Sequence, residues 1–275
     1  MASRSSAFGL GESEPESGST IGARVVTVAT LTERDIAKAI DHSLLRPELD
    51  DASVQAGCRL AAAYDVASVC VRPVDVRRAA AILALTDVEV GTVIGFPHGS
   101  STTATKVFEA HQALDDGATE LDMVIDIGAL KSGRDADVQA DIAAVVEAAH
   151  AGGAIVKVIL ENAYLTDDEK VRGSQRTEAA GAEFVKTSTG FAPGGATHAD
   201  LVLMRRSVSN RIQVKAAGGV RTLDALIDVL NLGTTRVGAT ATKAIIDDFR
   251  ARKAGGLPNA DGAPGTAVGA AGDGD

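Results

Sequence analysis

The sequence predicts a (β/α)8 barrel, the TIM-barrel class of α/β fold, on three observations. Short apolar stretches of strand length alternate along the chain with longer segments of helical pattern, as in parallel α/β folds. About eight such units fit into residues 31–253, and a barrel of this type takes roughly 250 residues. No hairpin signal interrupts the alternation. An open doubly wound sheet is the alternative, but it usually has fewer strands and a Gly-rich nucleotide fingerprint, which this sequence lacks.

Composition fits this fold class and argues against several functions. Hydrophobic residues make up 45% of the 275 residues, whereas aromatic residues make up only 3% and Trp is absent. The core is therefore built from Ala, Val, Ile and Leu, which is typical of parallel strands and the helices that cover them. The net charge of −10 argues against a nucleic-acid partner. No apolar run approaches the roughly 18 residues of a transmembrane helix, so we expect no membrane association.

One folded domain is expected at residues 31–253, between disordered tails at residues 1–30 and 254–275. The first tail is rich in Ser, Gly, Glu and Ala and the second in Gly, Ala and Asp, which is typical of disorder. The acidic residues of the first tail argue against a signal peptide. The two cysteines, Cys58 and Cys70, are too few for a disulfide framework. We therefore expect a cytoplasmic protein with reduced thiols; whether Cys70, near a strand end, reaches the pocket stays open.

The first half of the domain contains four expected strand–helix units, preceded by an extra helix at residues 32–40. Thr32 is a suitable N-cap for that helix, and Asp50 or Asp51 for the next one. Pro73 suits the first turn of a helix or the loop before it. The four units are expected as strand 41–45 with helix 50–64, strand 66–71 with helix 73–85, strand 89–94 with helix 102–116, and strand 119–125 with helix 135–151.

The second half repeats the pattern with clear helix boundaries. Gly152 and Gly153 end the helix before it, and Thr166 with Glu169 has the spacing of a capping box. Gly181 ends the helix that Thr166 begins. The four units are expected as strand 154–160 with helix 166–180, strand 184–186 with helix 197–208, strand 212–215 with helix 222–230, and strand 235–238 with helix 240–250.

Two lysines end consecutive strands, and each precedes a turn that contains glycine. Lys186 follows Phe184 and Val185, and Lys215 follows a similar apolar run. Lys is rarely buried, so its place at the end of an apolar strand needs a reason. Neighbouring strands lie about 4.8 Å apart, which lets the two amines interact, and a nearby cation or an apolar pocket turns an amine into a nucleophile. The alternative is that each lysine extends to solvent.

Other polar residues also fall at or near expected strand ends, where barrels of this class have their active sites. These residues are Asp41, Ser43, Asp122, Lys157, Lys186 and Lys215. Charged side chains inside a barrel need partners, and Asp122 and the lysines can supply them to one another. For Lys157 a second interpretation stays open, in which it only pairs with a carboxylate in the barrel wall.

A phosphate site is predicted beside these residues. Gly218 and Gly219 follow the Lys215 strand, and Gly238 and Thr240 lie between the last strand and its helix. Barrels often bind phosphate with the loops after strands seven and eight and a helix N-terminus, where free N–H groups favour an anion. The alternative is that these glycines only make tight turns.

Six stretches in order give the chain a resemblance to the deoxyribose-phosphate aldolase family. They are Asp41-His42-Ser43-Leu44-Leu45, Val69-Cys70-Val71-Arg72-Pro73, Val93-Ile94-Gly95-Phe96-Pro97-His98-Gly99, Glu120-Leu121-Asp122-Met123-Val124-Ile125, Phe184-Val185-Lys186-Thr187-Ser188-Thr189-Gly190-Phe191 and Val214-Lys215-Ala216-Ala217-Gly218-Gly219-Val220-Arg221-Thr222. The resemblance implies a class I aldolase without metal or cofactor. It implies reversible cleavage of 2-deoxy-D-ribose 5-phosphate into acetaldehyde and D-glyceraldehyde 3-phosphate, in deoxyribose phosphate catabolism, by a homo-oligomer.

The resemblance also implies residue roles. Lys186 matches the lysine that forms the Schiff base, and Lys215 the neighbour that lowers its pKa and transfers protons. Asp122 matches the acidic proton donor and acceptor, and Lys157 a lysine that orders the site and contacts a substrate hydroxyl. The family binds phosphate at the positions of Gly190, Gly218, Gly219, Gly238 and Thr240. Some members have a basic residue at the position of Phe191 and a hydroxyl at that of Ala241, so this chain offers phosphate fewer contacts.

Two other functions stay open. The first is a Schiff-base aldolase that acts on a different sugar phosphate. The second is a catalytically silent barrel that binds a sugar phosphate, although the presence of Asp122, Lys186 and Lys215 together weighs against it.

Overall fold

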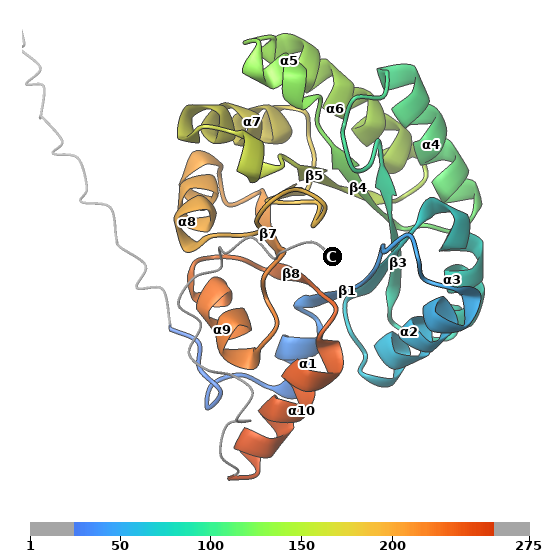
Figure 1. Cartoon of the computed structure of the whole chain (residues 1–275), viewed down its shortest axis with the longest axis vertical. Helices are drawn as coiled ribbons and strands as arrows, with labels where there is room; N and C mark the ends of the chain where they lie inside the picture. The colour runs from blue at the N-terminus through green and yellow to red at the C-terminus, as the bar shows by residue number, and fades with distance from the viewer. Residues whose placement is uncertain (1–24, 256–275) are drawn as a thin grey trace, which may run out of the picture.

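The computed structural model describes residues 25–255 and confirms the predicted fold class. Eight strands form a closed barrel in sequence order, and each pairs in parallel with its neighbours. Figure 1 shows the strands at the centre and the helices in a ring around them. The strands are β1 Ile40–Leu44, β2 Ser68–Val71, β3 Glu89–Ile94, β4 Glu120–Val124, β5 Ile155–Ile159, β6 Phe184–Lys186, β7 Gln213–Ala217 and β8 Arg236–Ala239.

The helices lie close to their expected positions, with a few differences. The helices are α1 Glu33–Ala37, α2 Asp51–Ala63, α3 Val76–Leu83, α4 Thr103–Asp115, α5 Ile127–Lys131, α6 Asp135–Ala151, α7 Asp167–Ala179, α8 His198–Ser207, α9 Leu223–Asn231 and α10 Thr242–Lys253. The helix expected at residues 32–40 ends at Ala37, because Ile40 already pairs with β8. Helix α5 was not predicted; Asp126 caps it by accepting a hydrogen bond from the Ala129 N–H. Pro73–Asp75 and Asn162–Tyr164 are short 3-10 turns.

Hydroxyl side chains begin several of the barrel helices. Thr102, Thr197 and Thr222 each accept a hydrogen bond from the backbone N–H three residues later. Thr166 does the same, and Glu169 bonds back to the Thr166 N–H, which completes the predicted capping box. Such caps satisfy N–H groups that have no partner inside the helix. They therefore determine where the loops before these four helices end.

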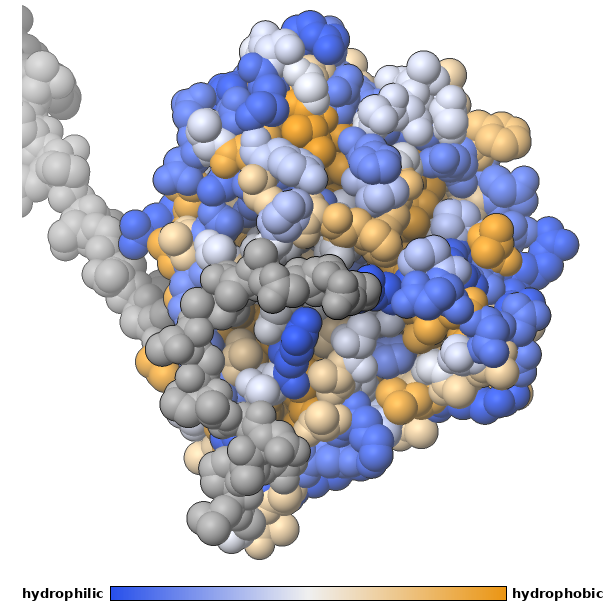
Figure 2. Space-filling view, viewed as in Figure 1, coloured by the Kyte–Doolittle hydropathy of each residue, from blue (hydrophilic) through white to orange (hydrophobic). Residues whose placement is uncertain are grey.

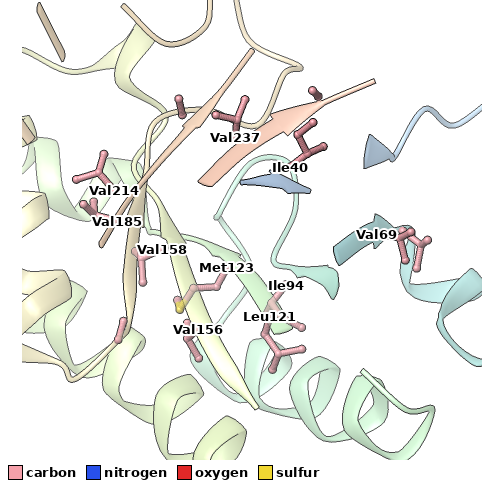
Figure 3. Close-up of a cluster of buried hydrophobic side chains, with 14 of the residues drawn as sticks. Ile40, Val69, Ile94, Leu121, Met123, Val156, Val158, Val185, Val214 and Val237 are labelled. Carbon is pink, nitrogen blue, oxygen red and sulfur yellow. The ribbon is translucent and has the colours of Figure 1, made fainter. Parts of the chain in front are cut away.

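Alternate residues of each strand point outward to the helices or inward to the barrel interior. The outward side is mainly apolar, and the inward side carries the charged residues. On β4, Leu121 and Met123 belong to the apolar cluster between strands and helices (Figure 3), whereas Glu120 and Asp122 bond to partners inside the barrel. Successive strand residues point to opposite faces, so this pattern repeats around the sheet. Figure 3 labels the cluster members Ile40, Val69, Ile94, Leu121, Met123, Val156, Val158, Val185, Val214 and Val237.

Both ends of the described chain pack against the helix ring of the barrel. Residues 25–30, which the sequence placed in the first tail, contact α9, because the Asn231 side chain bonds to both the N–H and the C=O of Val26. The remainder of the expected tails, residues 1–24 and 256–275, lies outside the described residues. The extra helix α1 packs against α10.

The surface of the helix ring is mainly polar on the face that the space-filling view presents. Figure 2 shows hydrophilic residues over most of this ring, with apolar side chains exposed singly or in small groups. Among residues 25–255, no helix is both long enough and apolar enough to span a bilayer.

Candidate active site

A cavity of about 220 Å³ opens at the carboxyl ends of the strands, where a barrel of this class has its active site. Its walls come from strands β1, β2, β6, β7 and β8 and from the loops that follow them. The residues that line it are Asp41, Ser43, Leu45, Arg46, Cys70, Lys186, Thr189, Gly190, Phe191, Lys215, Ala217, Gly218, Gly219, Val220, Arg221, Gly238, Ala239 and Thr240.

Lys186 and Lys215 lie side by side at the base of this cavity. They are register partners on β6 and β7, and both side chains are almost fully buried. The Nζ atom of each lies 2.7 Å from the same atom, Oδ2 of Asp122. The structure therefore brings together the two lysines and the carboxylate that the sequence singled out.

Lys157 lies below the cavity rather than in its wall. Its Nζ is 2.5 Å from Glu120 Oε2, 3.0 Å from Asp122 Oδ1 and 3.7 Å from Asp41 Oδ2. Three carboxylates surround the amine, and contact of Lys157 with a substrate hydroxyl stays a prediction. The pairing with carboxylates that the second interpretation expected is present, and the bond to Asp122 also fits a lysine that orders the site.

Arg236 completes the buried cluster, and sequence reasoning missed both it and Glu120. Arg236 Nε donates to Asp41 Oδ1 at 2.9 Å, and its Nη2 donates to Glu120 Oε1. Asp41 in turn has its Oδ2 2.6 Å from Lys215 Nζ. The alternation along β4 and β8 was the available signal, since it turns Glu120 to the same side as Asp122 and Arg236 to the same side as Gly238.

The charges of this cluster do not cancel if every group is ionised. Asp41, Glu120 and Asp122 are three carboxylates, and the cations that contact them are four: Lys157, Lys186, Lys215 and Arg236. An uncompensated charge inside a protein is costly. The cluster is neutral when one of the four cations gives up its proton.

Among the four cations, Lys186 is the one whose pKa is lowered, so it gives up its proton most readily. Burial lowers the pKa of Lys186; Asp122 opposes that effect and Lys215 adds to it, and the result lies below the ordinary value of 10.5. Burial also disfavours charge on Lys215 and Lys157, but nearby carboxylates overcome it and raise the pKa of both amines. Lys186 therefore holds its proton least tightly. The companion Lys215 contributes as expected, although burial is the larger cause.

Asp122 and Asp41 stay ionised. Burial opposes the charge of Asp122, but Lys157, Lys186 and Lys215 hold its pKa well below 3.8. The same opposition holds at Asp41, where Lys215, Lys157 and Arg236 lower the pKa of the carboxyl. Asp122 thus accepts hydrogen bonds from the three lysines, and Asp41 forms ion pairs with Lys157 and Lys215. Both carboxylates remain negative at neutral pH.

The predicted phosphate residues line the upper part of the same cavity. Gly190, Gly218, Gly219, Gly238 and Thr240 are all in its wall. Arg46 and Arg221 line it too, and sequence reasoning did not assign them, although Arg221 directly follows the Gly-Gly turn and Val220. Helix α10 begins at Thr242 with Ala241 as its N-cap, which has no side-chain oxygen to offer the first N–H groups. These features give an anion several donors.

The loop after β6 and the loop after β7 meet where Gly195 packs against Gly218. Gly218 has a φ of +80°, and a Cβ on Gly195 would come within 2.5 Å of the Gly218 carbonyl oxygen. The Ala196 N–H donates to Ala217 O at 3.0 Å, which fastens the two loops together. Glycine is therefore needed at position 218 for the backbone angle and at position 195 for the close approach.

Phe191 forms an apolar edge of the cavity. Its ring meets that of Phe96 edge to face, with centroids 5.3 Å apart, and it is 41% exposed. An aromatic side chain therefore stands where some members of the resembled family have a basic one.

Glu161 holds the loop that carries Gly190, and the sequence gave no signal for it. It is a buried residue just after β5 with a left-handed φ of +57°. Its carboxylate accepts hydrogen bonds from both the N–H and the hydroxyl of Thr189. Burial raises the pKa of Glu161 above 4.5. A strained, buried carboxylate of this kind is typical of a functional loop.

The two cysteines lie in different surroundings. Cys70 lines the cavity, which answers whether it reaches the pocket, and burial raises its thiol pKa to about 11. Cys58 is buried among core residues. Within residues 25–255, no group of His, Cys, Asp and Glu side chains is arranged to hold a metal ion. That a metal is not required stays a prediction.

The fold and the site define a class of protein: a TIM-barrel enzyme with a buried lysine of lowered pKa at the base of its cavity. The chain belongs to the DeoC/LacD family of aldolases, because the sequence model of that family matches residues 35–251. It is therefore an aldolase, a carbon–carbon lyase.

Curated relatives agree with this assignment. The chain is 53% identical over 214 residues to deoxyribose-phosphate aldolase 1 of Staphylococcus aureus, a match that covers 78% of this chain and 96% of the relative. It is 51% identical over 212 residues to the deoxyribose-phosphate aldolase of Bacillus cytotoxicus, covering 77% and 95%. The tetrameric deoxyribose phosphate aldolase structure from Aeropyrum pernix superposes with a TM-score of 0.75 at 28% identity, covering 80% of this chain and 93% of that one.

Proposed function

We propose that this aldolase reversibly cleaves 2-deoxy-D-ribose 5-phosphate into acetaldehyde and D-glyceraldehyde 3-phosphate through a Schiff base on Lys186. The observation that carries the proposal is the charge of the buried cluster, which is neutral only when one amine is unprotonated. Lys186 has the lowered pKa and lines the cavity. An unprotonated amine at this place is a nucleophile for an aldehyde.

Lys186 and Lys215 share the proton transfers of imine formation. The Lys186 nitrogen attacks C1 of the open-chain sugar, and its proton passes to the carbonyl oxygen to give a carbinolamine. Protonated Lys215 then donates a proton to the carbinolamine hydroxyl, which leaves as water, and the C–N bond becomes a protonated imine. The positive charge has moved from Lys215 to the imine, so the cluster stays neutral overall.

The carbon–carbon bond breaks in the step that returns this charge. Neutral Lys215 accepts the C3 hydroxyl proton while the C2–C3 electron pair moves into the imine. Glyceraldehyde 3-phosphate leaves, and an uncharged enamine of acetaldehyde remains on Lys186. Lys215 next protonates the enamine carbon. Water then hydrolyses the protonated imine, which releases acetaldehyde and neutral Lys186 and returns one proton to Lys215. Asp122 touches both amines at 2.7 Å, so it steers the proton without entering the cavity itself.

The substrate phosphate sits at the opposite end of the cavity in this proposal. Backbone N–H groups at Gly190, Gly218, Gly219 and Gly238, the Thr240 hydroxyl and the start of α10 surround it. Arg221 and Arg46 supply the local positive charge that a chain of net charge −10 otherwise lacks at this point. A phosphate held there fixes the distance from the sugar C1 to Lys186.

The wider setting of the enzyme is proposed from its relatives and its thiols. We infer a homo-oligomer, as in the tetrameric enzyme from Aeropyrum pernix, and light scattering of the purified chain tests this. We infer a cytoplasmic place in deoxyribose phosphate catabolism, in line with the free thiols of Cys58 and Cys70; cell fractionation tests it. We also propose that residues 31–253 act as one aldolase domain, which limited proteolysis tests.

Borohydride trapping followed by peptide mass spectrometry tests the chemistry. Incubation with deoxyribose 5-phosphate and borohydride should leave a reduced adduct on the peptide that contains Lys186. The Lys186→Met variant is the matched control and should yield neither adduct nor product, whereas prior treatment with EDTA should change nothing. An adduct on another lysine would overturn the mechanism. Cleavage of a different sugar phosphate with an intact adduct would change the substrate, and binding without adduct or cleavage would indicate a silent barrel.

A further inference from the structure

We infer that Arg236 and Glu120 are positioning residues, and that this buried ion pair sets the protonation of Lys186 without touching it. The inference rests on the proposed function, because it concerns the nucleophile of that reaction. Neither residue lines the cavity, and neither has an assigned role in the mechanism above.

The pair lies in the barrel interior, where Arg236 bonds to two of the three carboxylates of the cluster. Arg236 Nη2 donates to Glu120 Oε1 and Arg236 Nε to Asp41 Oδ1, while the guanidinium stacks over the Phe184 ring at 5.9 Å. Glu120 Oε2 accepts from Lys157 at 2.5 Å. Arg236 is 13% exposed and Glu120 5% exposed as side chains, so solvent screens their charges little.

Two chains of contacts connect this pair with Lys186. In the first, Arg236 bonds to Asp41, Asp41 contacts Lys215, and Lys215 shares Asp122 Oδ2 with Lys186. In the second, Glu120 bonds to Lys157, which bonds to Asp122 Oδ1. Both chains end on Asp122. A change of charge at either member of the pair therefore reaches the nucleophile through fixed, buried groups.

The sign of each effect follows from the count of charges. Without the Arg236 cation, the cluster has three carboxylates and three lysines, and it is neutral only when Lys186 is protonated. Without the Glu120 anion, the cluster already carries excess positive charge while Lys186 is neutral, and protonation of Lys186 increases it. Loss of Arg236 therefore favours protonated Lys186, and loss of Glu120 disfavours it.

The other charged or titratable groups around Lys186 are unsuitable for such a role or such a test. They are Asp41 on β1, Cys70 on β2, Asp122 on β4, Lys157 on β5, Glu161 after β5 and Lys215 on β7. Asp41, Cys70 and Lys215 line the cavity, Asp122 touches Lys186, Lys157 touches Asp122, and Glu161 holds the phosphate loop. On β3, the register partner of Asp122 is the uncharged Val93. The Arg236–Glu120 pair is thus the part of the cluster that acts by charge from a distance.

The pH dependence of kcat/KM tests the inference on the full-length protein. This parameter reports the ionisation of the free enzyme, and activity falls on the acid side when Lys186 becomes protonated. Arg236→Gln should move this acid limb to higher pH, and Glu120→Gln should move it to lower pH, each on the order of one pH unit. The double variant should return the limb toward that of the wild type, and Arg236→Lys, which keeps the charge, should hold it in place.

Matched measurements separate this effect from loss of structure. Asp141→Asn removes a buried carboxylate that pairs with Lys106 outside the barrel, and it should lower stability without moving the limb. The profiles should be repeated with 2-deoxy-D-ribose, because the phosphate of the usual substrate titrates near pH 6 itself. If Arg236→Gln does not fold, the other two variants decide. Glu120→Gln must then move the acid limb to lower pH, and the double variant must return it toward the wild-type position.

The outcomes distinguish the inference from the proposed function. Limbs that move in the same direction, or stay fixed while rates fall, overturn the role of the pair. Wild-type protein that forms no borohydride adduct on Lys186 overturns the proposed function instead. An adduct on Lys186 together with unmoved limbs leaves the function standing and removes the inference alone.

Discussion

Lys186 and Lys215 face each other across β6 and β7, and each holds its Nζ 2.7 Å from one shared oxygen of Asp122. Despite this symmetry, the pKa is lowered for Lys186 and raised for Lys215. The difference arises because Lys215 also contacts Asp41 at 2.6 Å. In the proposed mechanism, this second carboxylate is what distinguishes the proton carrier, Lys215, from the nucleophile, Lys186.

The Lys215 side chain should contribute both charge and proton transfer. Lys215→Met is expected to lower kcat/KM on the order of 10²–10⁴-fold and to shift the acid limb to higher pH, since the lost cation no longer disfavours a proton on Lys186. Lys215→Arg keeps the charge but does not release a proton at neutral pH. It should therefore return the acid limb to its wild-type pH while kcat/KM stays low. Equal rates for the Arg variant and the wild type would contradict the proton-transfer role.

Phe191 should limit the affinity for phosphate. Phe191→Lys places a cation at the exposed edge of the cavity, and we expect KM for deoxyribose 5-phosphate to fall roughly two- to fivefold, since an exposed ion pair is worth up to about 1 kcal/mol. The gain should shrink in high salt. Steady-state kinetics with 2-deoxy-D-ribose provides the control, and an equal fall in KM for that sugar would show that phosphate is not what the lysine binds.

His42 should make the fold sensitive to acid. It is buried, its Nδ1 lies 2.9 Å from Thr242 Oγ1, and burial lowers the pKa of the imidazole from 6.5 to about 4. The unfolded chain therefore binds the proton first as the pH falls, and stability is lost between pH 6.5 and about 4. The loss should be on the order of 3 kcal/mol.

Urea unfolding across this pH window measures the contribution of His42. The His42→Gln variant has no titrating ring, so its stability should decline less steeply over the same window. A variant with the same decline as the wild type would assign the acid sensitivity to other groups.

The buried pair of Lys106 and Asp141 should stabilise the outer layer of the barrel. Lys106 Nζ donates to Asp141 Oδ2 at 2.6 Å and to Val124 O at 3.0 Å, and its side chain is fully buried. Lys106→Met leaves Asp141 without its cation and should cost about 3–5 kcal/mol of unfolding free energy.

A double variant separates the pair from the packing around it. Lys106→Met with Asp141→Leu removes both charges and should recover most of the stability in denaturant unfolding, because replacing a whole buried pair is often neutral. Additive losses in the double variant would show that the two charges do not compensate each other.

Most of the barrel was predictable because its signals are local. The alternation of apolar strands with capped helices located all eight strands to within about two residues of their positions, and Thr166 with Glu169 began α7 as expected. Short features without periodicity were missed, among them α5, whose start depends on one hydrogen bond to Asp126. The strand-end lysines and glycine turns likewise indicated the site, because strand ends meet at one rim in a closed parallel barrel.

The sequence by itself determined the fold class, the family resemblance and the lysines around which the site forms, since strand periodicity, helix caps and turn residues act between near neighbours. Only the tertiary structure decided which charges meet. Glu120 and Arg236 are 116 positions apart, and the register of β4 and β5 places Lys157 beside Asp122 and Glu120. Closure of the barrel brings such groups into a low-dielectric interior. There the balance of all their charges, which no local pattern encodes, makes Lys186 hold its proton less tightly than Lys157 and Lys215 do.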